Sequence, residues 1–528
     1  SERHITIVPE IEMPGHSLAA LTAYPDLSCN GGPFEVAKEW GVFDDVFCAG
    51  NEKTIEFLQD VLNEVCELFP GKYIHVGGDE CPKTRWKACE KCQKRMKEHN
   101  LKDEHELQSY FIQRIEKYLN GKGKQVIGWD EILEGGLAPN AAVMSWRGTE
   151  GGIAAAKEKH KVVMTPGSHC YFDHYQGNPL YEPHAIGGFT PIEKVYAYDP
   201  VPAELNAEEA KYIMGAQGNV WTEYILLPKD VEYMALPRMS ALAEVLWTNK
   251  ENKNLNSFVK RLNTHLNNPV FAKTNYSKTH HNIHYTLEPA ANGVRVKINT
   301  LDTTRAIFVS AIPHEHPELV HEFSDRIFNK QGAGKIVTVT TPTNVAAYAV
   351  AKNENDQVKN RSVITELNLY ISKSTSKKVS FNVEPDEKYK GNGSFTLVDA
   401  VKANPRRQNK EWLAWQGKDI EIVIDLEKKQ KLKELKVGYY DDRSNWIYPP
   451  NSLEVFVSKD GVRYKSAGIL VRGEFGHDTK PTKGLFQFSL KKKARYVKII
   501  AKNPGNIPEG KPGAGKPSWL FFDEIEIY

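Results

Sequence analysis

Three features are scarce in this 528-residue chain: long apolar runs, an excess of one charge, and cysteine beyond the first third. Without a run of about 18 apolar residues, the sequence predicts no membrane-spanning helix. The 69 basic and 67 acidic residues leave a formal net charge of +2, so no overall field favours nucleic acid or an anionic membrane. We therefore expect a water-exposed globular protein with no nucleic-acid partner.

The seven cysteines all lie within the first 170 residues, unlike those of a small disulfide-stapled domain. The spacing Cys89-x-x-Cys92 is half of a zinc motif, with Cys81 nearby, but no second such pair follows. We predict no metal and expect helix-surface cysteines or one local disulfide. Cys29 and Cys48 flank a Gly-Gly-Pro loop. They could form a disulfide in an oxidising compartment, and the sequence leaves this question open.

The length predicts about three domains. In the first, 1–268, short apolar strands alternate with helical patterns, which indicates an α/β fold with a parallel sheet. The predicted strands are 5–9, 73–78, 125–128, 142–145, 162–166 and 215–220.

Nearly every one of these strands ends in a polar or aromatic cluster. A barrel of alternating strands and helices carries its active site at the carboxyl ends of its strands. The sequence therefore predicts a TIM-type (β/α)8 barrel with one site at that face. Six strands do not close such a barrel, so we expect the first strands to be missing from this chain.

After Trp247 the pattern changes to β alternation. This alternation predicts a small antiparallel sandwich over residues 269–376 and a second all-β domain over residues 377–528. Tryptophans in the last domain, such as Trp412 and Trp415, indicate either a carbohydrate-binding surface or a packed core, and we favour the core.

The run Tyr73-Ile-His-Val-Gly-Gly-Asp79-Glu80 is the most informative motif. Two carboxylates follow a strand and two glycines. Adjacent residues of extended backbone face opposite ways, so we expect Asp79 and Glu80 to contact different parts of a substrate. The alternative is an acidic helix N-cap, which Asp-Glu-Cys-Pro also suits.

Trp129, Trp146 and Trp221 each follow a predicted strand beside polar residues. Flat rings stack on the apolar face of a pyranose, and carboxylates such as Asp173 and Glu223 accept hydrogen bonds from its hydroxyls. Core packing is the alternative for each ring, but three such positions favour a sugar pocket.

Four separated motifs together resemble the family 20 glycoside hydrolases, the β-N-acetylhexosaminidases. They are Pro-Glu-Ile-Glu-Met-Pro-Gly-His, His-Val-Gly-Gly-Asp-Glu, Gly-Trp-Asp-Glu and Asn-Val-Trp-Thr-Glu, within residues 1–250. The remainder resembles a fibronectin-like module and a discoidin-like module of the coagulation-factor type C kind.

The resemblance implies a retaining exo-enzyme that removes terminal N-acetylglucosamine or N-acetylgalactosamine. Glu80 would be the general acid and base. The substrate's 2-acetamido oxygen would attack C1 to give an oxazolinium ion. Asp79 and Tyr171 would orient the acetamido group for this attack.

The remaining positions are implied to bind substrate: His16, Trp129, Trp146, Asp173, Trp221 and Glu223. For His16, a turn-capping role is the alternative. The family also uses an arginine on a first strand that is not visible here, which leaves the activity of this chain open.

Two other functions compete: a glycan-binding protein that no longer catalyses, and a family member specialised for sulfated or disaccharide-terminated glycans. We predict no cofactor. The expected partner is a glycan with a terminal N-acetylhexosamine. The resemblance also implies a periplasmic, cell-surface or secreted bacterial protein.

Overall fold

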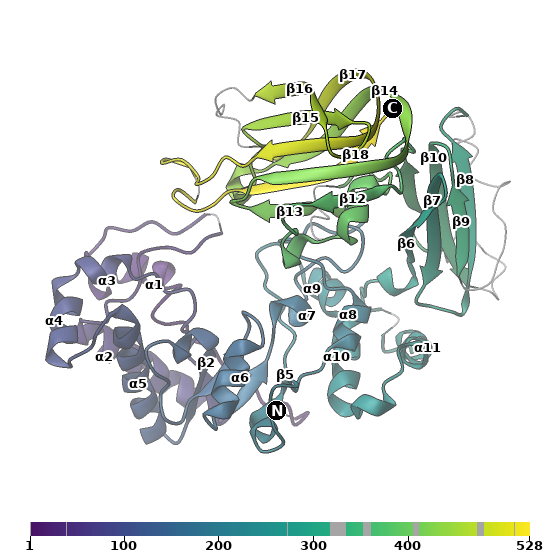
Figure 1. The fold of residues 1–528 in the computed structure, drawn as a ribbon. Coiled ribbons are helices and arrows are strands. Elements are labelled where there is room, and N and C mark those ends of the chain that lie inside the picture. The colour runs from purple at the N-terminus through teal and green to yellow at the C-terminus, as the bar shows by residue number, and fades with distance from the viewer. Residues whose placement is uncertain are drawn as a thin grey trace. The chain divides into compact units, whose positions relative to one another are not determined.

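The computed structural model describes residues 2–38, 40–271, 273–316, 334–351, 361–404, 411–471, 480–511 and 513–528. The chain forms two compact units (Figure 1). The first comprises residues 1–178 and 182–277, and the second comprises residues 179–181 and 278–528. The division into three domains stays a prediction.

The first unit contains one parallel sheet in the order β1-β2-β3-β4-β5. Its strands are β1 Tyr73–His75, β2 Gln125–Trp129, β3 Ala142–Ser145, β4 Val162–Met164 and β5 Ile213–Ala216. Parallel strands in sequence order with helices between them confirm the predicted α/β fold with a parallel sheet. Closure of a full barrel, and its missing strands, stay predictions.

Helices connect and flank these strands. They are α1 Leu18–Ala23, α2 Glu52–Leu68, α3 Thr84–Ala88, α4 Glu90–Glu98, α5 Glu104–Gly121, α6 Glu150–Lys157, α7 Gly167–Cys170, α8 Ile192–Ala197, α9 Pro228–Ala235, α10 Arg238–Trp247 and α11 Leu255–Leu266. The predicted apolar stripe of α2 is buried at Ile55, Leu58 and Leu62. The Asn51 side chain caps α2 by accepting a hydrogen bond from the backbone N–H of Lys53.

Two strand predictions in this unit need correction. Residues 5–9 do not form a strand; the chain first pairs with β1 at Pro9, whose carbonyl accepts from the His75 N–H at 2.9 Å. The strand predicted at 215–220 is β5, which begins two residues earlier and ends at Ala216. In both cases the pairing partner, which the sequence pattern does not contain, sets the limits.

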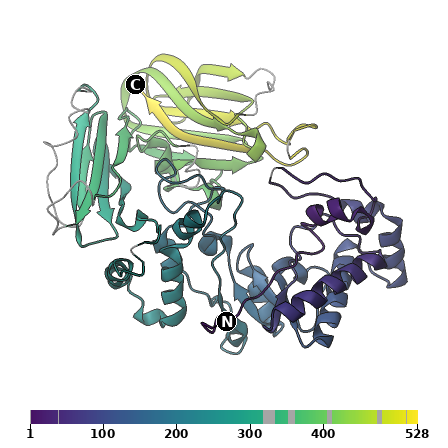
Figure 2. The same ribbon diagram turned by 180° about the vertical axis from the view of Figure 1, so that it is seen from behind.

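The second unit begins with two three-stranded antiparallel sheets, β6-β7-β9 and β11-β10-β8. Their strands are β6 Ile283–Ala290, β7 Gly293–Thr300, β8 Arg305–Pro313, β9 Lys335–Val339, β10 Thr343–Ala351 and β11 Thr365–Leu369. Strands β6 to β10 run side by side in both views (Figure 2). Alternate residues of the two sheets, among them Val296 and Ala347, share one core.

A seven-stranded antiparallel sheet follows, in the order β13-β18-β14-β17-β15-β16 with β12 on β14. Its strands are β12 Lys378–Phe381, β13 Leu413–Gln416, β14 Ile420–Asp441, β15 Ser452–Ser458, β16 Tyr464–Val471, β17 Thr482–Lys502 and β18 Trp519–Ile527. Trp412 and Trp415 are fully buried, which confirms core packing for these two rings. Among the described residues, no helix has both the length and the apolar character to cross a bilayer.

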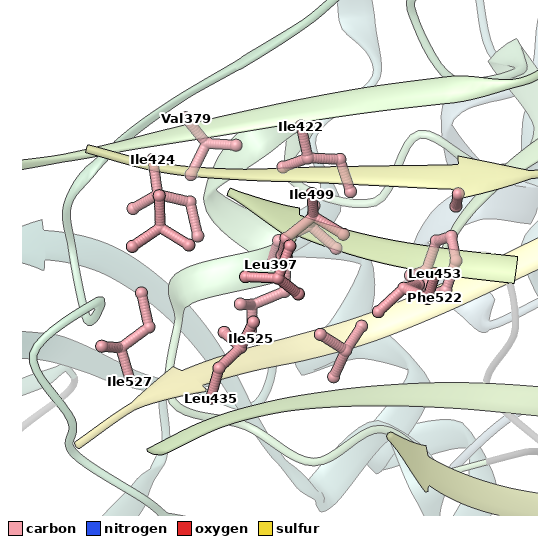
Figure 3. Packing of buried hydrophobic residues seen from close by; sticks show 14 of the residues in the cluster. Val379, Leu397, Ile422, Ile424, Leu435, Leu453, Ile499, Phe522, Ile525 and Ile527 are labelled. Carbon is pink, nitrogen blue, oxygen red and sulfur yellow. The ribbon is translucent and has the colours of Figure 1, made fainter. Parts of the chain in front are cut away.

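The core of this last sheet makes a stability prediction. Ile525 is fully buried among Leu435, Phe522 and other apolar side chains (Figure 3). Ile525→Ala removes packed methylenes and leaves a cavity, so we expect a loss of about 2–5 kcal/mol. Native-state hydrogen exchange of peptides from β14 and β17 measures this loss. The matched variant Ile469→Ala, on an exposed side chain of β16, should change protection by less than about 0.5 kcal/mol. Equal protection in both variants would contradict the assignment of this core.

Candidate active site

The end of β1 carries two carboxylates on strained backbone. Gly77 and Gly78 have φ angles of 66° and 95°, and Glu80 has a φ of 44°. A Cβ on Gly77 would lie 1.8 Å from the Glu12 carboxylate, so only glycine fits there. The left-handed conformation of a non-glycine residue such as Glu80 costs free energy, and such residues concentrate at functional sites.

Residues 9–16 lie directly along this strand end. The N–H of Ile11 donates to the His75 carbonyl at 3.0 Å, and the N–H of Met13 donates to the Val76 carbonyl at 3.2 Å. A Cβ on Gly15 would lie 2.8 Å from the Asp79 carbonyl oxygen. The two segments are thus in backbone contact up to the carboxylates.

His16 lies between the two carboxylates. Its Nε2 is 3.5 Å from Asp79 Oδ2 and 3.3 Å from Glu80 Oε2. Hydrogen bonds to Asp79 and Glu80 raise the pKa of His16 to about 10, so it carries a proton at neutral pH. The expectation that the adjacent carboxylates face opposite ways is wrong, because the backbone at Glu80 is left-handed and not extended.

Glu12 is a site residue that the sequence analysis did not assign. Its Oε1 accepts from the Gly78 N–H at 2.9 Å. Burial, and then the negative charge of Asp79, raise the pKa of Glu12 to about 10, so this carboxyl is neutral at pH 7. Oδ1 of Asp79 is buried and has no hydrogen-bond partner among the described residues. The pair of acidic residues in Glu10-Ile-Glu12 could have indicated that Glu12 belongs to the site, since residues two apart on extended backbone share a face.

The indole N–H groups of Trp129 and Trp146 each donate to a carboxylate. Trp129 Nε1 donates to Glu10 Oε1 at 2.9 Å, and its ring centroid lies 4.8 Å from that of His75. Trp146 Nε1 donates to Glu131 Oε2 at 2.9 Å. Burial raises the pKa of Glu131 to about 7. Glu131, the last residue of the Gly-Trp-Asp-Glu motif, therefore positions the Trp146 ring.

Tyr171 joins the aromatic residues to the carboxylates. Its ring stacks on Trp146 with centroids 6.3 Å apart, and Trp129 and Trp221 are 5.7 Å apart. Burial raises the pKa of the Tyr171 hydroxyl; hydrogen bonds with Trp221 and Asn219 partly oppose this, and the charge of Asp79 acts in the same direction as burial. The hydroxyl therefore keeps its proton at neutral pH and can donate a hydrogen bond, within electrostatic range of Asp79.

Asp173, Trp221 and Glu223 line one small cavity together with His184. Oδ1 of Asp173 is buried without a hydrogen-bond partner among the described residues. Burial, and then the charge of Glu223, raise the pKa of Asp173 to about 6. The structure thus brings Asp173 and Glu223, two predicted substrate-binding carboxylates, together beside Trp221, while Glu223 itself is exposed.

Arg238 is a second position that the sequence analysis missed. It is fully buried at the start of α10, and its guanidinium donates to the carbonyls of Phe172, His174 and Thr190. Burial lowers the pKa of Arg238 to about 9, which still leaves it charged at pH 7. It holds in place the loop that carries Asp173. A lone arginine within an otherwise apolar helix start was the only sequence signal.

Comparisons with known proteins match two regions. Residues 1–250 match the model of glycosyl hydrolase family 20, catalytic domain, and residues 373–511 match the F5/8 type C domain. A beta-hexosaminidase of Porphyromonas gingivalis is 58% identical over 263 residues, which are 50% of this chain and 34% of that protein. One from Vibrio furnissii is 34% identical over 46% of this chain and 40% of that protein.

The chain therefore spans about a third to two fifths of the length of these relatives. Among solved structures, the exo beta-N-acetylglucosaminidase of Vibrio harveyi is 32% identical. That match covers 53% of this chain and 44% of the other, with a TM-score of 0.47.

The proton on His16 should make the stability of the folded protein depend on pH. Its pKa is raised from 6.5 to about 10 in the folded protein, so the folded state binds this proton more tightly than the unfolded chain. The resulting stabilisation is complete below pH 6.5 and is lost as the pH rises towards 10. We expect the stability of the wild type relative to His16→Gln to fall over this window, on the order of 1–2 kcal/mol after solvent screening.

Chemical unfolding at several pH values measures this difference. His265→Gln, on an exposed histidine of α11, should show no such pH dependence relative to the wild type. A difference between wild type and His16→Gln that stays constant from pH 6 to 10 would contradict the contact of His16 with the two carboxylates.

Proposed function

Because residues 1–250 belong to glycosyl hydrolase family 20, we propose that this chain is a retaining exo-β-N-acetylhexosaminidase. Its substrates would be glycans that end in N-acetylglucosamine or N-acetylgalactosamine. The observation that carries this proposal is the convergence of Asp79 and Glu80 on one protonated histidine, at 3.5 and 3.3 Å. The proposed location is periplasmic, cell-surface or secreted, where such glycans occur.

Glu80 is the proposed general acid and base. Its side chain is 37% exposed, so the carboxyl can reach a glycosidic oxygen at the mouth of the site. In the first step it gives a proton to that oxygen as the C1–O bond breaks. In the second step it takes a proton from the water that attacks C1.

Asp79 is the proposed partner of the substrate's acetamido group. The acetamido oxygen forms the new bond to C1, and positive charge spreads towards the amide nitrogen of the oxazolinium ion. The buried, unpartnered Oδ1 of Asp79 is an acceptor suited to the N–H of that amide. The neutral carboxyl of Glu12 beside it adds no second negative charge at pH 7.

Tyr171 is proposed to donate a hydrogen bond from its hydroxyl to the acetamido oxygen and so orient this nucleophile. Burial keeps that hydroxyl protonated, as the role requires. The rings of Trp129, Trp146 and Trp221 would enclose the acetyl methyl group and the sugar face, since stacked rings bury apolar pyranose carbons. The ring spacings of 5.7 and 6.3 Å support an aromatic enclosure.

Asp173 and Glu223 are proposed to bind the outer hydroxyls of the terminal sugar. They line the same small cavity as Trp221. Carboxylates that end a pocket accept hydrogen bonds from a terminal sugar and leave no room for a further one, which is the basis of exo action.

Replacing the proposed acid tests this function. Glu80→Gln removes the transferable proton but keeps the shape, and we expect kcat/KM on p-nitrophenyl N-acetyl-β-glucosaminide to fall by about 10² to 10⁴. The matched variant Glu56→Gln, on an exposed residue of α2, should keep the wild-type rate.

Wild-type activity in Glu80→Gln would contradict the assignment of the acid. Binding of a thiazoline analogue of the oxazolinium ion separates catalysis from recognition. Binding by wild type without hydrolysis would overturn the catalytic proposal in favour of a glycan-binding protein.

A further inference from the structure

Four of the seven cysteines, far apart in sequence, meet in the first unit. Cys29 follows the 3-10 turn Pro25–Leu27, and Cys48 precedes α2. Cys89 is the N-cap residue of α4, and Cys92 lies in its first turn. Cys48, Cys89 and Cys92 are buried, and Cys29 is half-buried. The cluster lies outside the carboxylate and aromatic residues of the candidate active site.

The sulfur positions have the geometry of a tetrahedral metal site. The Sγ atoms of Cys48 and Cys92 are 3.6 Å apart, those of Cys48 and Cys89 are 3.7 Å apart, and those of Cys29 and Cys92 are 3.8 Å apart. All four sulfurs lie within 4.8 Å of one another. Four thiolates at about 2.3 Å from zinc form a tetrahedron with edges of about 3.8 Å. A disulfide needs about 2.05 Å, so these separations fit a shared metal ion better than paired sulfurs.

The backbone around the cluster keeps Cys29 and Cys48 close to Cys89 and Cys92. Ser28 and Phe47 form an antiparallel bridge, and the N–H of Cys48 donates to the Leu27 carbonyl at 2.9 Å. A Cβ on Gly50 would lie 2.2 Å from the Lys91 carbonyl carbon, so only glycine allows this approach. The loop after Cys48 is therefore packed against the first turn of α4.

The helix end favours thiolates at two of the four cysteines. Cys89 and Cys92 lie at the amino end of α4, where the helix dipole favours negative charge. Zinc binds the deprotonated sulfur, so this helix end favours the charged form that both ligands would take.

We propose that Cys29, Cys48, Cys89 and Cys92 bind one Zn²⁺ in a structural site. Four protein ligands leave no open coordination position, which distinguishes a structural zinc from a catalytic one. The expectation of no metal rested on the lack of a second Cys-x-x-Cys pair. The other two ligands are 19 residues apart in the sequence, and a bridge between residues 28 and 47 brings them together.

The position of this site gives it a role. The chain runs from His16 through α1 to Cys29, and from Glu80 through α3 to Cys89. The zinc would thus join the far ends of the two segments that meet at the carboxylates. Its binding free energy would stabilise the loops that hold His16 and Glu80 in contact.

Metal analysis of the purified full chain tests this proposal. We expect about one zinc per chain by inductively coupled plasma mass spectrometry, with loss of that zinc in Cys48→Ser and in Cys92→Ser. The matched control Cys66→Ser changes a half-buried cysteine of α2 outside the cluster and should keep it. Zinc retained in all three variants, or iron in place of zinc, would overturn the assignment.

Thiol titration of the wild type keeps the test valid if a variant fails to fold. Under denaturing conditions with a chelator, a zinc site predicts seven reactive thiols, and it predicts that the four ligands become reactive in the native protein only after chelation. A metal-free protein in which these four cysteines form disulfides would contradict the proposal. So would a metal-free protein in which all four react freely.

Discussion

The backbone contact between residues 9–16 and the end of β1 is the constraint on which the candidate site depends. Hydrogen bonds from the backbone N–H groups of Ile11 and Met13 to the strand end fix the register of this segment along β1. Gly15 and Gly77 allow an approach that any Cβ would prevent, since it would meet Asp79 or Glu12. This closeness sets the position of His16 relative to both carboxylates, and the aromatic rings then surround the same strand ends.

Such close packing concentrates negative charge, and the structure balances it with two protons. Glu12 lies beside Asp79, and its pKa is raised to about 10 by burial and by that neighbour, so it is neutral. His16 holds the second proton, because both carboxylates accept from its ring. A site that holds neutral and charged forms of like groups side by side is suited to proton transfer. Arg238 also contributes, because its hydrogen bonds to backbone carbonyls fix the loop of Asp173.

Sequence patterns predicted the parts of this protein that depend on local periodicity and burial. The helix at Ile55, Leu58 and Leu62 and the strand at 142–145 are examples, because one apolar face determines the helix and a continuous buried run determines the strand. What the sequence did not reveal depends on partners distant in the chain. The edge pairing at Pro9, the left-handed backbone of Glu80 and the protonation of Glu12 all arise from contacts between segments about 65 residues apart. The same holds for Cys29 and Cys48, whose spacing has no motif of its own.

In the mechanism proposed for this site, the substrate's own acetamido oxygen is the nucleophile, and Asp79 orients it. The most direct measurement compares hydrolysis of p-nitrophenyl β-glucosaminides that bear N-acetyl, N-fluoroacetyl, N-difluoroacetyl and N-trifluoroacetyl groups. Fluorine withdraws electron density from the amide oxygen, so we expect kcat/KM to fall steeply with each added fluorine. A rate that does not depend on fluorination would contradict it, because a protein carboxylate would then be the nucleophile.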